Sequence, residues 1–564
     1  MGLALRDKQT RASTDADSIS SSTKYSLRTM SEASSVHKPS EQSPLLSPSS
    51  PKRGHLLELP RKKTPKWRSS QAITLLLIVV LILATCGDQL MESPQTRIIE
   101  AIICYRHYEH ADPSKLLLGR AVIGPGAVGG VAEMDCKAAD AVQSQLASLR
   151  GWQQLLDGFP SLIMAVPIGW AADKYGRKPF LTLAVISFVF RASWIQGVCW
   201  WWQAFDIRWT WFSSVHGLIS GSSPVVSALF FVMLSDITPE AERAAIFLRV
   251  GAANIISALV MPPLSAWLMK WNPWIPSLTG TLLEVIAFFL CFIVPETLGY
   301  RHPNGSPGFS HPPTPSPESM PAPPDIAPIR EPISADFSTR ISTAIRESTS
   351  FIWADWRVPA LILTFVGHIL IASSGQLLLQ YCSKRYGLSF SDATLLLSVR
   401  AGVNIILLFV ILPWISTWVM QRFHLSGQRK DLYLSRASMA VVALGWFLVA
   451  ASPNVALVVV SMAVASFGSG AMLLIRAFMT SLVPANHIAR VYSVISIVDT
   501  LGAMFGAPVL AGLFSRGLAI GGGGIGLPFY FVSILSAAFT VILMAVRMRK
   551  NDHGYEPVQQ ADDE

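Results

Sequence analysis

Charged residues are scarce in this sequence. Only 14% of its 564 residues are Asp, Glu, Lys or Arg, whereas 51% are apolar. A soluble globular domain carries about 25% charged residues, so this composition excludes a soluble globular protein for most of the chain. The net charge of +9 does not indicate a nucleic-acid partner, because the sequence shows no soluble fold on which basic residues would cluster.

The sequence also lacks the motifs of ATP-driven and catalytic proteins. No Gly-rich loop ends in Gly-Lys-Ser or Gly-Lys-Thr, the pattern that cradles nucleotide phosphates. No metal-ligand cluster, nucleophile–base constellation or cofactor loop is present either. We therefore expect neither an enzyme nor a cofactor or metal site. We expect no cleaved leader, because the first apolar run begins only near Gln71.

Long apolar runs are the main positive feature. Each has roughly twenty residues, the length that a helix needs to cross the hydrocarbon core of a membrane. They predict an all-α integral membrane protein with twelve spanning helices, six before and six after a long polar stretch. The expected spans are 71–91, 154–173, 179–200, 211–235, 245–269, 275–295, 357–380, 392–419, 433–451, 455–480, 489–514 and 526–547.

Charge and composition divide the chain further. An even number of spans puts both termini on one side, and the Lys and Arg clusters near the spans mark that side as cytoplasmic. The first polar segment cannot bury enough surface to fold, and the central one has the Pro, Ser and Gly content of a linker. The predicted parts are a disordered cytoplasmic tail (1–69), a six-helix bundle (70–296) with an extracellular loop (92–150), a cytoplasmic central loop (297–355), a second six-helix bundle (356–548) and a cytoplasmic tail (549–564).

The chain has six cysteines. Cys104 and Cys136 share the predicted extracellular loop, and that compartment permits a disulfide. A bond between them and two free thiols are both open interpretations.

The segment between the second and third expected spans carries the most specific motif. It reads Gly169-Trp-Ala-Ala-Asp173-Lys174-Tyr175-Gly176-Arg177-Lys178. In residues and in position it resembles the signature loop of the major facilitator superfamily. Asp236 and the downstream Arg243 resemble the partners that members of this family often place after the fourth span. Cys104-Tyr-Arg and Glu133-Met-Asp-Cys136-Lys137 resemble a large group of fungal members.

The resemblance implies two six-helix bundles around a central cavity, which rock to expose it to each side in turn. It also implies that Asp173 faces the N-terminus of the eleventh helix, where the helix dipole favours an anion. That contact would hold the outward-open state and break for inward opening. Gly169 would permit close helix packing and Gly176 a tight turn. The alternative is an ordinary basic loop that obeys the positive-inside rule.

Ionisable residues inside the spans need a partner or a water-filled cavity, because burying their charge in lipid costs at least a few kcal/mol. Arg191 and Glu284 lie about halfway along the third and sixth spans, and we predict that they form a structural ion pair. The alternative makes Glu284 a proton carrier. The full set is Asp88, Arg191, His216, Glu284, His368, Arg400, Arg476 and Asp499.

Five residues are candidates for substrate or proton binding, because the resemblance places their helices around the central cavity. Asp499 or His368 would carry a proton. Arg400 would bind an anionic substrate or hold Asp499, and a purely structural pair between these two is the alternative. Gln376 and Gln380 share one helix face and would bind a substrate or a neighbouring helix.

The function expected from the resemblance is secondary active transport of a small organic solute, coupled to protons and directed to export of a secondary metabolite or toxic compound. The alternatives are import of a nutrient or organic anion, with Arg400 as its anchor, and a membrane sensor that transports nothing. We expect a monomer whose partners are the solute, protons and membrane lipid. The plasma membrane is the expected location; Glu41–Leu46 resembles an acidic dileucine signal, which leaves the vacuolar membrane open.

Overall fold

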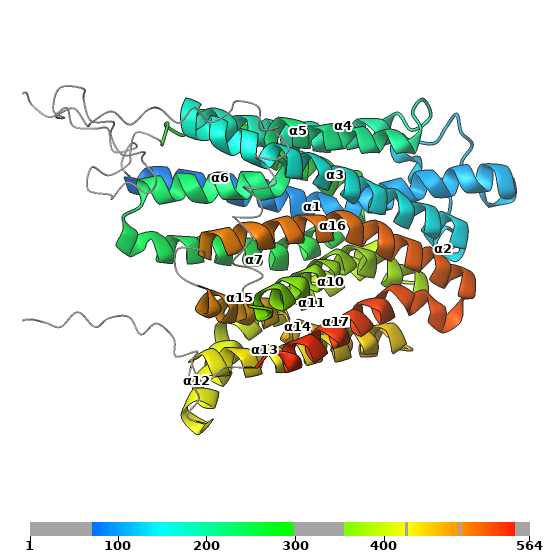
Figure 1. Ribbon diagram of the computed structural model, residues 1–564. Coiled ribbons are helices and arrows are strands. Elements are labelled where there is room, and N and C mark those ends of the chain that lie inside the picture. The colour runs from blue at the N-terminus through cyan, green and yellow to red at the C-terminus, as the bar shows by residue number, and fades with distance from the viewer. Residues whose placement is uncertain (1–69, 298–354, 424–426, 484–487, 548–564) are drawn as a thin grey trace, which may run out of the picture. The chain divides into compact units, whose positions relative to one another are not determined.

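The computed structural model describes residues 70–297, 355–423, 427–483 and 488–547, and nearly all of them are helical (Figure 1). Helices follow from an apolar surrounding, because hydrocarbon offers no hydrogen-bond partner and each backbone group must bond within its own segment. The two predicted tails and nearly all of the predicted central loop lie outside the described residues.

The described part of the N-terminal half contains long helical segments at the first six expected positions. They are α1 (Ser70–Ala111), α3 (Asp140–Tyr175), α4 (Lys178–Trp200), a broken segment of η4 (Ile207–Val215), α5 (His216–Ser220) and α6 (Ser222–Ile237), then α7 (Glu240–Met269) and α8 (Trp274–Ile293). The loop between α1 and α3 holds η2 (Pro113–Lys115), η3 (Pro125–Ala127) and α2 (Glu133–Ala138).

The C-terminal half repeats this plan at the other six positions. Its segments are α10 (Arg357–Tyr386), α11 (Phe390–Ile406) with η6 (Leu407–Ile411) and α12 (Leu412–Phe423), α13 (Gly427–Ala451), α14 (Val455–Phe467) with α15 (Ala471–Leu482), α16 (Ile488–Ile520), and η8 (Gly522–Gly526) with α17 (Leu527–Ala545). Among the described residues, eleven segments are long and apolar enough to cross a membrane. α10 has 30 residues and occupies the seventh expected position, so the predicted all-α architecture is confirmed.

The predicted extracellular loop is shorter than expected. α1 continues twenty residues past the predicted end of the first span, to Ala111, and α3 begins at Asp140. The charges that suggested a loop are paired inside the protein: Arg97 donates to Glu100 at 2.8 Å, and the Glu100 side chain is fully buried. Pairing within the helix therefore allows a charged stretch to stay helical.

The two halves meet along α3 and α16, where small residues permit close approach. A Cβ atom on Gly151 of α3 would lie 3.0 Å from Cβ of Ala511 on α16, and one on Gly158 would lie 2.2 Å from Cγ of Met504. The α10 helix also packs on α16 through Gly506, whose Cβ position is 2.8 Å from Leu370. The contacts between α3 and α16 form the boundary between the halves, beside which the candidate site lies.

Candidate substrate cavity

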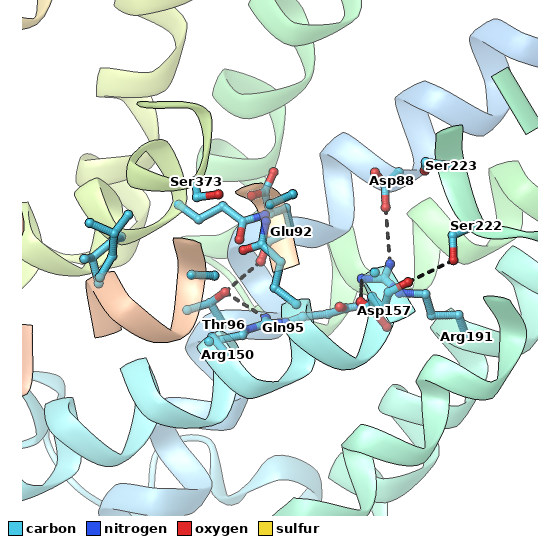
Figure 2. A pocket seen from close by; sticks show the side chains of 18 of the residues that line it. Asp88, Glu92, Gln95, Thr96, Arg150, Asp157, Arg191, Ser222, Ser223 and Ser373 are labelled. Atoms are coloured by element: carbon cyan, nitrogen blue, oxygen red, sulfur yellow. Dashed lines mark hydrogen bonds and ion pairs between the residues drawn. The ribbon is translucent and has the colours of Figure 1, made fainter. Parts of the chain in front are cut away.

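A cavity of about 600 Å³ lies between the two halves. Figure 2 shows its polar side chains converging from several helices. Helices α1, α3, α4, α5 and α6 line it from the N-terminal half, and α10, α11 and α16 from the other half. Its polar and charged lining residues are Asp88, Glu92, Ser93, Gln95, Thr96, Arg150, Gln154, Asp157, Ser161, Arg191, His216, Ser222, Ser223, Ser373, Gln376, Gln380, Ser496, Asp499 and Thr500.

The helix break at Gly221 opens onto this cavity. Gly221 adopts a φ of 78° and Ser222 a φ of 62°, and Ser222 through Pro224 line the cavity. Irregular backbone at membrane depth is tolerated where it lines a cavity. The Ser222 hydroxyl donates to the backbone oxygen of Asp157 at 3.1 Å (Figure 2), which ties the break to α3.

Arg191 is the centre of a charged cluster on the N-terminal wall. Its guanidinium lies 3.6 Å from Asp88 and 3.4 Å from Asp157 (Figure 2). The Ser214 hydroxyl donates to the other Asp157 oxygen at 2.5 Å. The cluster joins α1, α3, α4 and η4 at the edge of the cavity.

The predicted ion pair between Arg191 and Glu284 is wrong. Arg191 turns toward the cavity, where it donates to Asp157 at 3.4 Å and forms an ion pair with Asp88 at 3.6 Å. Glu284 is only 3% exposed and its side chain packs against α1, with its Cγ 3.1 Å from where a Cβ of Gly87 would lie. One of its carboxylate oxygens has no hydrogen-bond partner in the described part of the chain.

Glu92 and Arg150 also face the cavity, although the sequence analysis assigned both to the loop. Arg150 donates to the Thr96 hydroxyl at 2.8 Å, and the Glu92 side chain hydrogen-bonds with Gln376 from the other half. The signal that would have found Glu92 is the spacing of Asp88, Glu92 and Thr96, which places all three on one face of a helix that continues.

On the C-terminal wall, Asp499 pairs with Arg476 at 3.1 Å. The proposed structural pair between Asp499 and Arg400 is therefore wrong. Arg400 lines a separate cavity of about 190 Å³ within the C-terminal half, with its guanidinium close against Gly375 of α10. His368 lies in α10, and its side chain is outside the described residues.

Polar contacts seal the cavity at the end that carries Cys104 and Cys136. Gln380 donates its amide to the backbone oxygen of Gln143 at 2.7 Å, and Lys384 pairs with Asp140 at 2.6 Å. We call the set of Glu133, Lys137, Asp140, Gln143, Gln380 and Lys384 the outer seal. Each of its contacts named here joins one half to the other or supports a residue that does.

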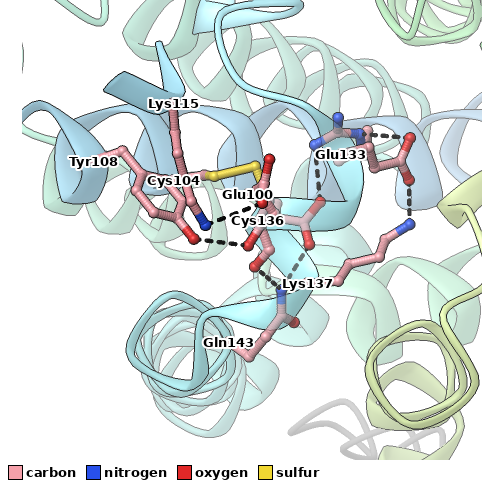
Figure 3. Close-up of a disulfide and its surroundings, with 10 residues drawn as sticks. Glu100, Cys104, Tyr108, Lys115, Glu133, Cys136, Lys137 and Gln143 are labelled. Atoms are coloured by element: carbon pink, nitrogen blue, oxygen red, sulfur yellow. Dashed lines mark hydrogen bonds and ion pairs between the residues drawn. A yellow bond between two sulfur atoms is a disulfide. The ribbon is translucent and has the colours of Figure 1, made fainter. Parts of the chain in front are cut away.

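The short helix α2 carries two residues of the outer seal. Cys104 and Cys136 form a disulfide that ties α2 to α1 (Figure 3). Lys137 donates to the Leu388 oxygen of the other half at 2.6 Å, and Glu133 accepts from the Phe390 N–H at 2.9 Å. The disulfide therefore holds the element that bridges the halves.

Burial and pairing shift the pKa values of these two residues. Burial lowers the pKa of Lys137, although the neighbouring Glu133 opposes the shift. For Glu133, burial would raise the pKa, but Arg97 and Lys137 outweigh it and leave the value below its ordinary range.

The signature loop lies at the opposite end, between α3 and α4. Gly176 has a φ of 102°, and Glu296 accepts the backbone N–H groups of Arg177 at 2.9 Å and Lys178 at 3.1 Å. Arg177 pairs with the largely buried Asp236 and, at 3.4 Å, with Asp173. The loop is thus fastened to its own half.

The other predicted loop residues have fewer contacts. The Asp173 side chain is 71% exposed, and a Cβ on Gly169 would have no atom within 4 Å. Arg243 donates to the Ser235 oxygen at 3.1 Å. In the described part of the chain, Asp173 is therefore not engaged with the other half, whereas the outer seal is closed.

Comparison with known proteins gives one family and several relatives. A family model described as Major Facilitator Superfamily matches residues 144–507. The chain is 29% identical to an MFS-type transporter, aprT, of Aspergillus flavus, over 85% of this chain and 89% of that protein. It is 28% identical to the MFS efflux pump atnC of Emericella nidulans (83% and 86% covered) and 27% identical to the efflux pump ustT of Aspergillus flavus (79% and 82%).

Two solved structures have the same fold. A D-xylose-proton symporter matches with a TM-score of 0.54 at 13% identity, over 84% of this chain and 99% of that one. The POT family transporter PepTSo matches with a TM-score of 0.54 at 11% identity, over 85% and 98%. At such low identity these likenesses concern the fold alone.

Proposed function

Because the chain belongs to the major facilitator superfamily, we propose that this multi-pass membrane transporter exports a small organic solute through the central cavity by alternating access. The cavity carries the proposal: it lies between the halves, holds about 600 Å³, and is closed by the outer seal. That volume suits a drug-sized molecule. Rocking of the halves would break the seal and expose the same lining to the other side.

Outward direction is supported by two relatives. The proteins atnC and ustT are named as efflux pumps, and they match over 83% and 79% of this chain. We propose the plasma membrane as its location. We place the signature loop in the cytoplasm, because basic clusters flank the spans on that side. In this orientation the closed outer seal faces the outside, and the state that we infer is inward-facing and ready to take up a cytoplasmic solute.

Proton coupling is the source of energy that we propose, with Asp499 as the carrier. Asp499 lines the cavity and its only ion pair in the described part of the chain is with Arg476. A proton on Asp499 would release Arg476, so that loading with a proton changes the contacts between α15 and α16. His368 is the alternative carrier, from its position on α10.

The test compares small molecules in cells and medium, with and without the gene. We expect at least one compound to disappear from the medium and accumulate inside the cells when the gene is lost, and the wild-type gene to reverse both changes. A compound that instead stays in the medium and is depleted inside would show import. Unchanged distributions of all compounds would contradict transport.

A further inference from the structure

Negative charge exceeds positive charge around Arg191. This single guanidinium lies near two carboxylates, Asp88 at 3.6 Å and Asp157 at 3.4 Å. Asp157 has a second partner in the Ser214 hydroxyl. Asp88 has no other hydrogen bond or ion pair within the described residues, and its side chain is 63% exposed at the cavity surface. Asp88 is therefore the carboxylate with free capacity to bind a ligand.

Three neighbours bear on the charge of this cluster: His216, Glu284 and the N-terminus of α6. His216 lines the same cavity, and its Nδ1 donates to the backbone oxygen of Ser213 at 2.9 Å, so this nitrogen is not turned to Asp88. Behind Asp88 lies Glu284, a further buried carboxyl group with an oxygen that lacks a partner in the described part of the chain and with Asp88 and Arg191 as its charged neighbours. The N-terminus of α6 contributes about half a positive charge, and it bonds to α3 at Asp157. This is less than the single charge that Asp88 leaves open.

The other charges of the cavity are balanced locally. Asp499 has Arg476 at 3.1 Å. Glu92 has Gln376 and the nearby Arg150, which is held on Thr96. The excess negative charge is thus confined to one place on the N-terminal wall.

We propose that the transported solute carries a positively charged nitrogen, as a protonated amine or a quaternary ammonium group, and that Asp88 binds it. This inference rests on the proposed function and names the solute class. A carboxylate at the wall of a cavity bounded by low-dielectric protein attracts a cation more strongly than it would in bulk water. Phe188 lines the same cavity, and its ring offers the face that cations prefer. Across the cavity, Leu377, Ala503, Ala507 and Leu510 would contact an apolar body.

The experiment uses two probes of equal shape and opposite charge, tetraphenylphosphonium and tetraphenylborate. Their binding to the purified full-length protein in detergent is measured by titration calorimetry at pH 7.5. We expect tetraphenylphosphonium to bind and tetraphenylborate to bind at least tenfold more weakly. Equal binding of both would overturn the proposal, because an apolar pocket without charge preference would explain it. No binding of the cation at this pH would also overturn it, because Asp88 would then not serve as a cation site.

Variants of Asp88 test whether this residue is the one that binds the cation. Asp88→Asn should weaken tetraphenylphosphonium binding at least tenfold, and Asp88→Glu, which keeps the charge, should restore it to within about threefold. The control is Glu109→Gln on the same helix, whose carboxylate pairs with Arg120 at 3.2 Å away from the cavity and whose loss should leave binding unchanged. Unaltered binding in a folded Asp88→Asn protein would contradict the assignment of cation binding to Asp88. That result would leave the proposed transport intact, because the metabolite comparison tests transport without reference to charge.

Discussion

Ser144 of α3 and Ser515 of α16 meet hydroxyl to hydroxyl across the boundary between the halves, 2.8 Å apart. Both belong to the end of the molecule that the outer seal closes. Alternating access requires this boundary to open, because the cavity has to reach the outer side. The distance between these two hydroxyl groups therefore reports the state of the transporter.

A disulfide between these positions should lock the transporter. In the Ser144→Cys/Ser515→Cys protein the two sulfur atoms would replace hydroxyl oxygens that already touch, so oxidation should cross-link the halves and stop transport. Reduction should restore it. Efflux of the compound identified by the metabolite comparison is measured before and after treatment with dithiothreitol. The single substitutions are the controls, and a cross-linked protein that still transports would contradict the proposed movement.

Acid should loosen the outer seal. The pKa of Glu133 is lowered from its ordinary value of 4.5, so its carboxylate stabilises the closed seal fully above that value and loses this effect as pH falls through the lowered pKa. Spin labels are attached at Asp112→Cys and Gly523→Cys, in loops of the two halves. The distance between them, which increases on opening, is measured by pulsed electron paramagnetic resonance on samples frozen at pH values from 7 to 3. The open population should grow below about pH 4.5.

Glu133→Gln provides the matched test of that response. The glutamine keeps an acceptor for the Phe390 N–H but removes the negative charge beside Lys137. The open population should already be raised at pH 7 and change less with acid. The same pH response in Glu133→Gln as in the wild type would assign it to another group. Glu109→Gln, which changes an ion pair outside the outer seal, should respond as the wild type does.

The fold could be predicted from the sequence because a run of about twenty apolar residues indicates a membrane-spanning helix. The end of α1 could not, because its extension past residue 91 is polar: Arg97 and Glu100 satisfy each other, and Gln143 of α3 donates to Glu100 at 2.7 Å. The contact from Gln143 depends on a neighbour distant in the chain. Because the end of α1 and the start of α3 were assigned to a loop, Glu92 and Arg150 were not predicted as cavity residues.

The partners of membrane-embedded charges were the least predictable part of the site. Depth along the chain put Arg191 and Glu284 at the same level, but helix rotation turned Arg191 toward Asp88 and Asp157. Sequence position fixes the height of a residue in a span and leaves its direction to packing. In the signature loop, Gly176 has the turn conformation that its motif predicts, with a φ of 102°. Its distant partner Glu296, which accepts from the backbone of Arg177, could not be read from the spacing.

Asp499→Asn should separate solute exchange from proton-driven transport. The asparagine can still accept a hydrogen bond from Arg476, so the fold should survive, but it cannot bind and release a proton. We expect transport against a gradient to fall at least tenfold, about 1.4 kcal/mol in activation free energy, while exchange of labelled for unlabelled solute persists. Both are measured in proteoliposomes with an imposed pH difference. Retained dependence on that difference would move the proton site elsewhere, with His368 as the next residue to change.

Asp173→Asn should slow transport without weakening the folded protein. Asp173 is 71% exposed, and its pair with Arg177 at 3.4 Å is of the surface kind that contributes about 0–1 kcal/mol. Its proposed contact with the other half belongs to the outward-open state, which the substitution would destabilise. We therefore expect a melting temperature close to that of the wild type and a lower transport rate. An unchanged rate would mean that the segment is only a basic loop.

Asp236→Asn is the informative comparison for Asp173→Asn. Asp236 pairs with the same Arg177, but here the two side chains are only 10% and 6% exposed. Removing one charge of a buried pair leaves the other without compensation, which typically costs about 3–5 kcal/mol. We expect the melting temperature in detergent to fall clearly for Asp236→Asn and hardly at all for Asp173→Asn. If both substitutions lowered it equally, Asp173 would be a structural residue of this conformation, and the latch between the halves would lose its support.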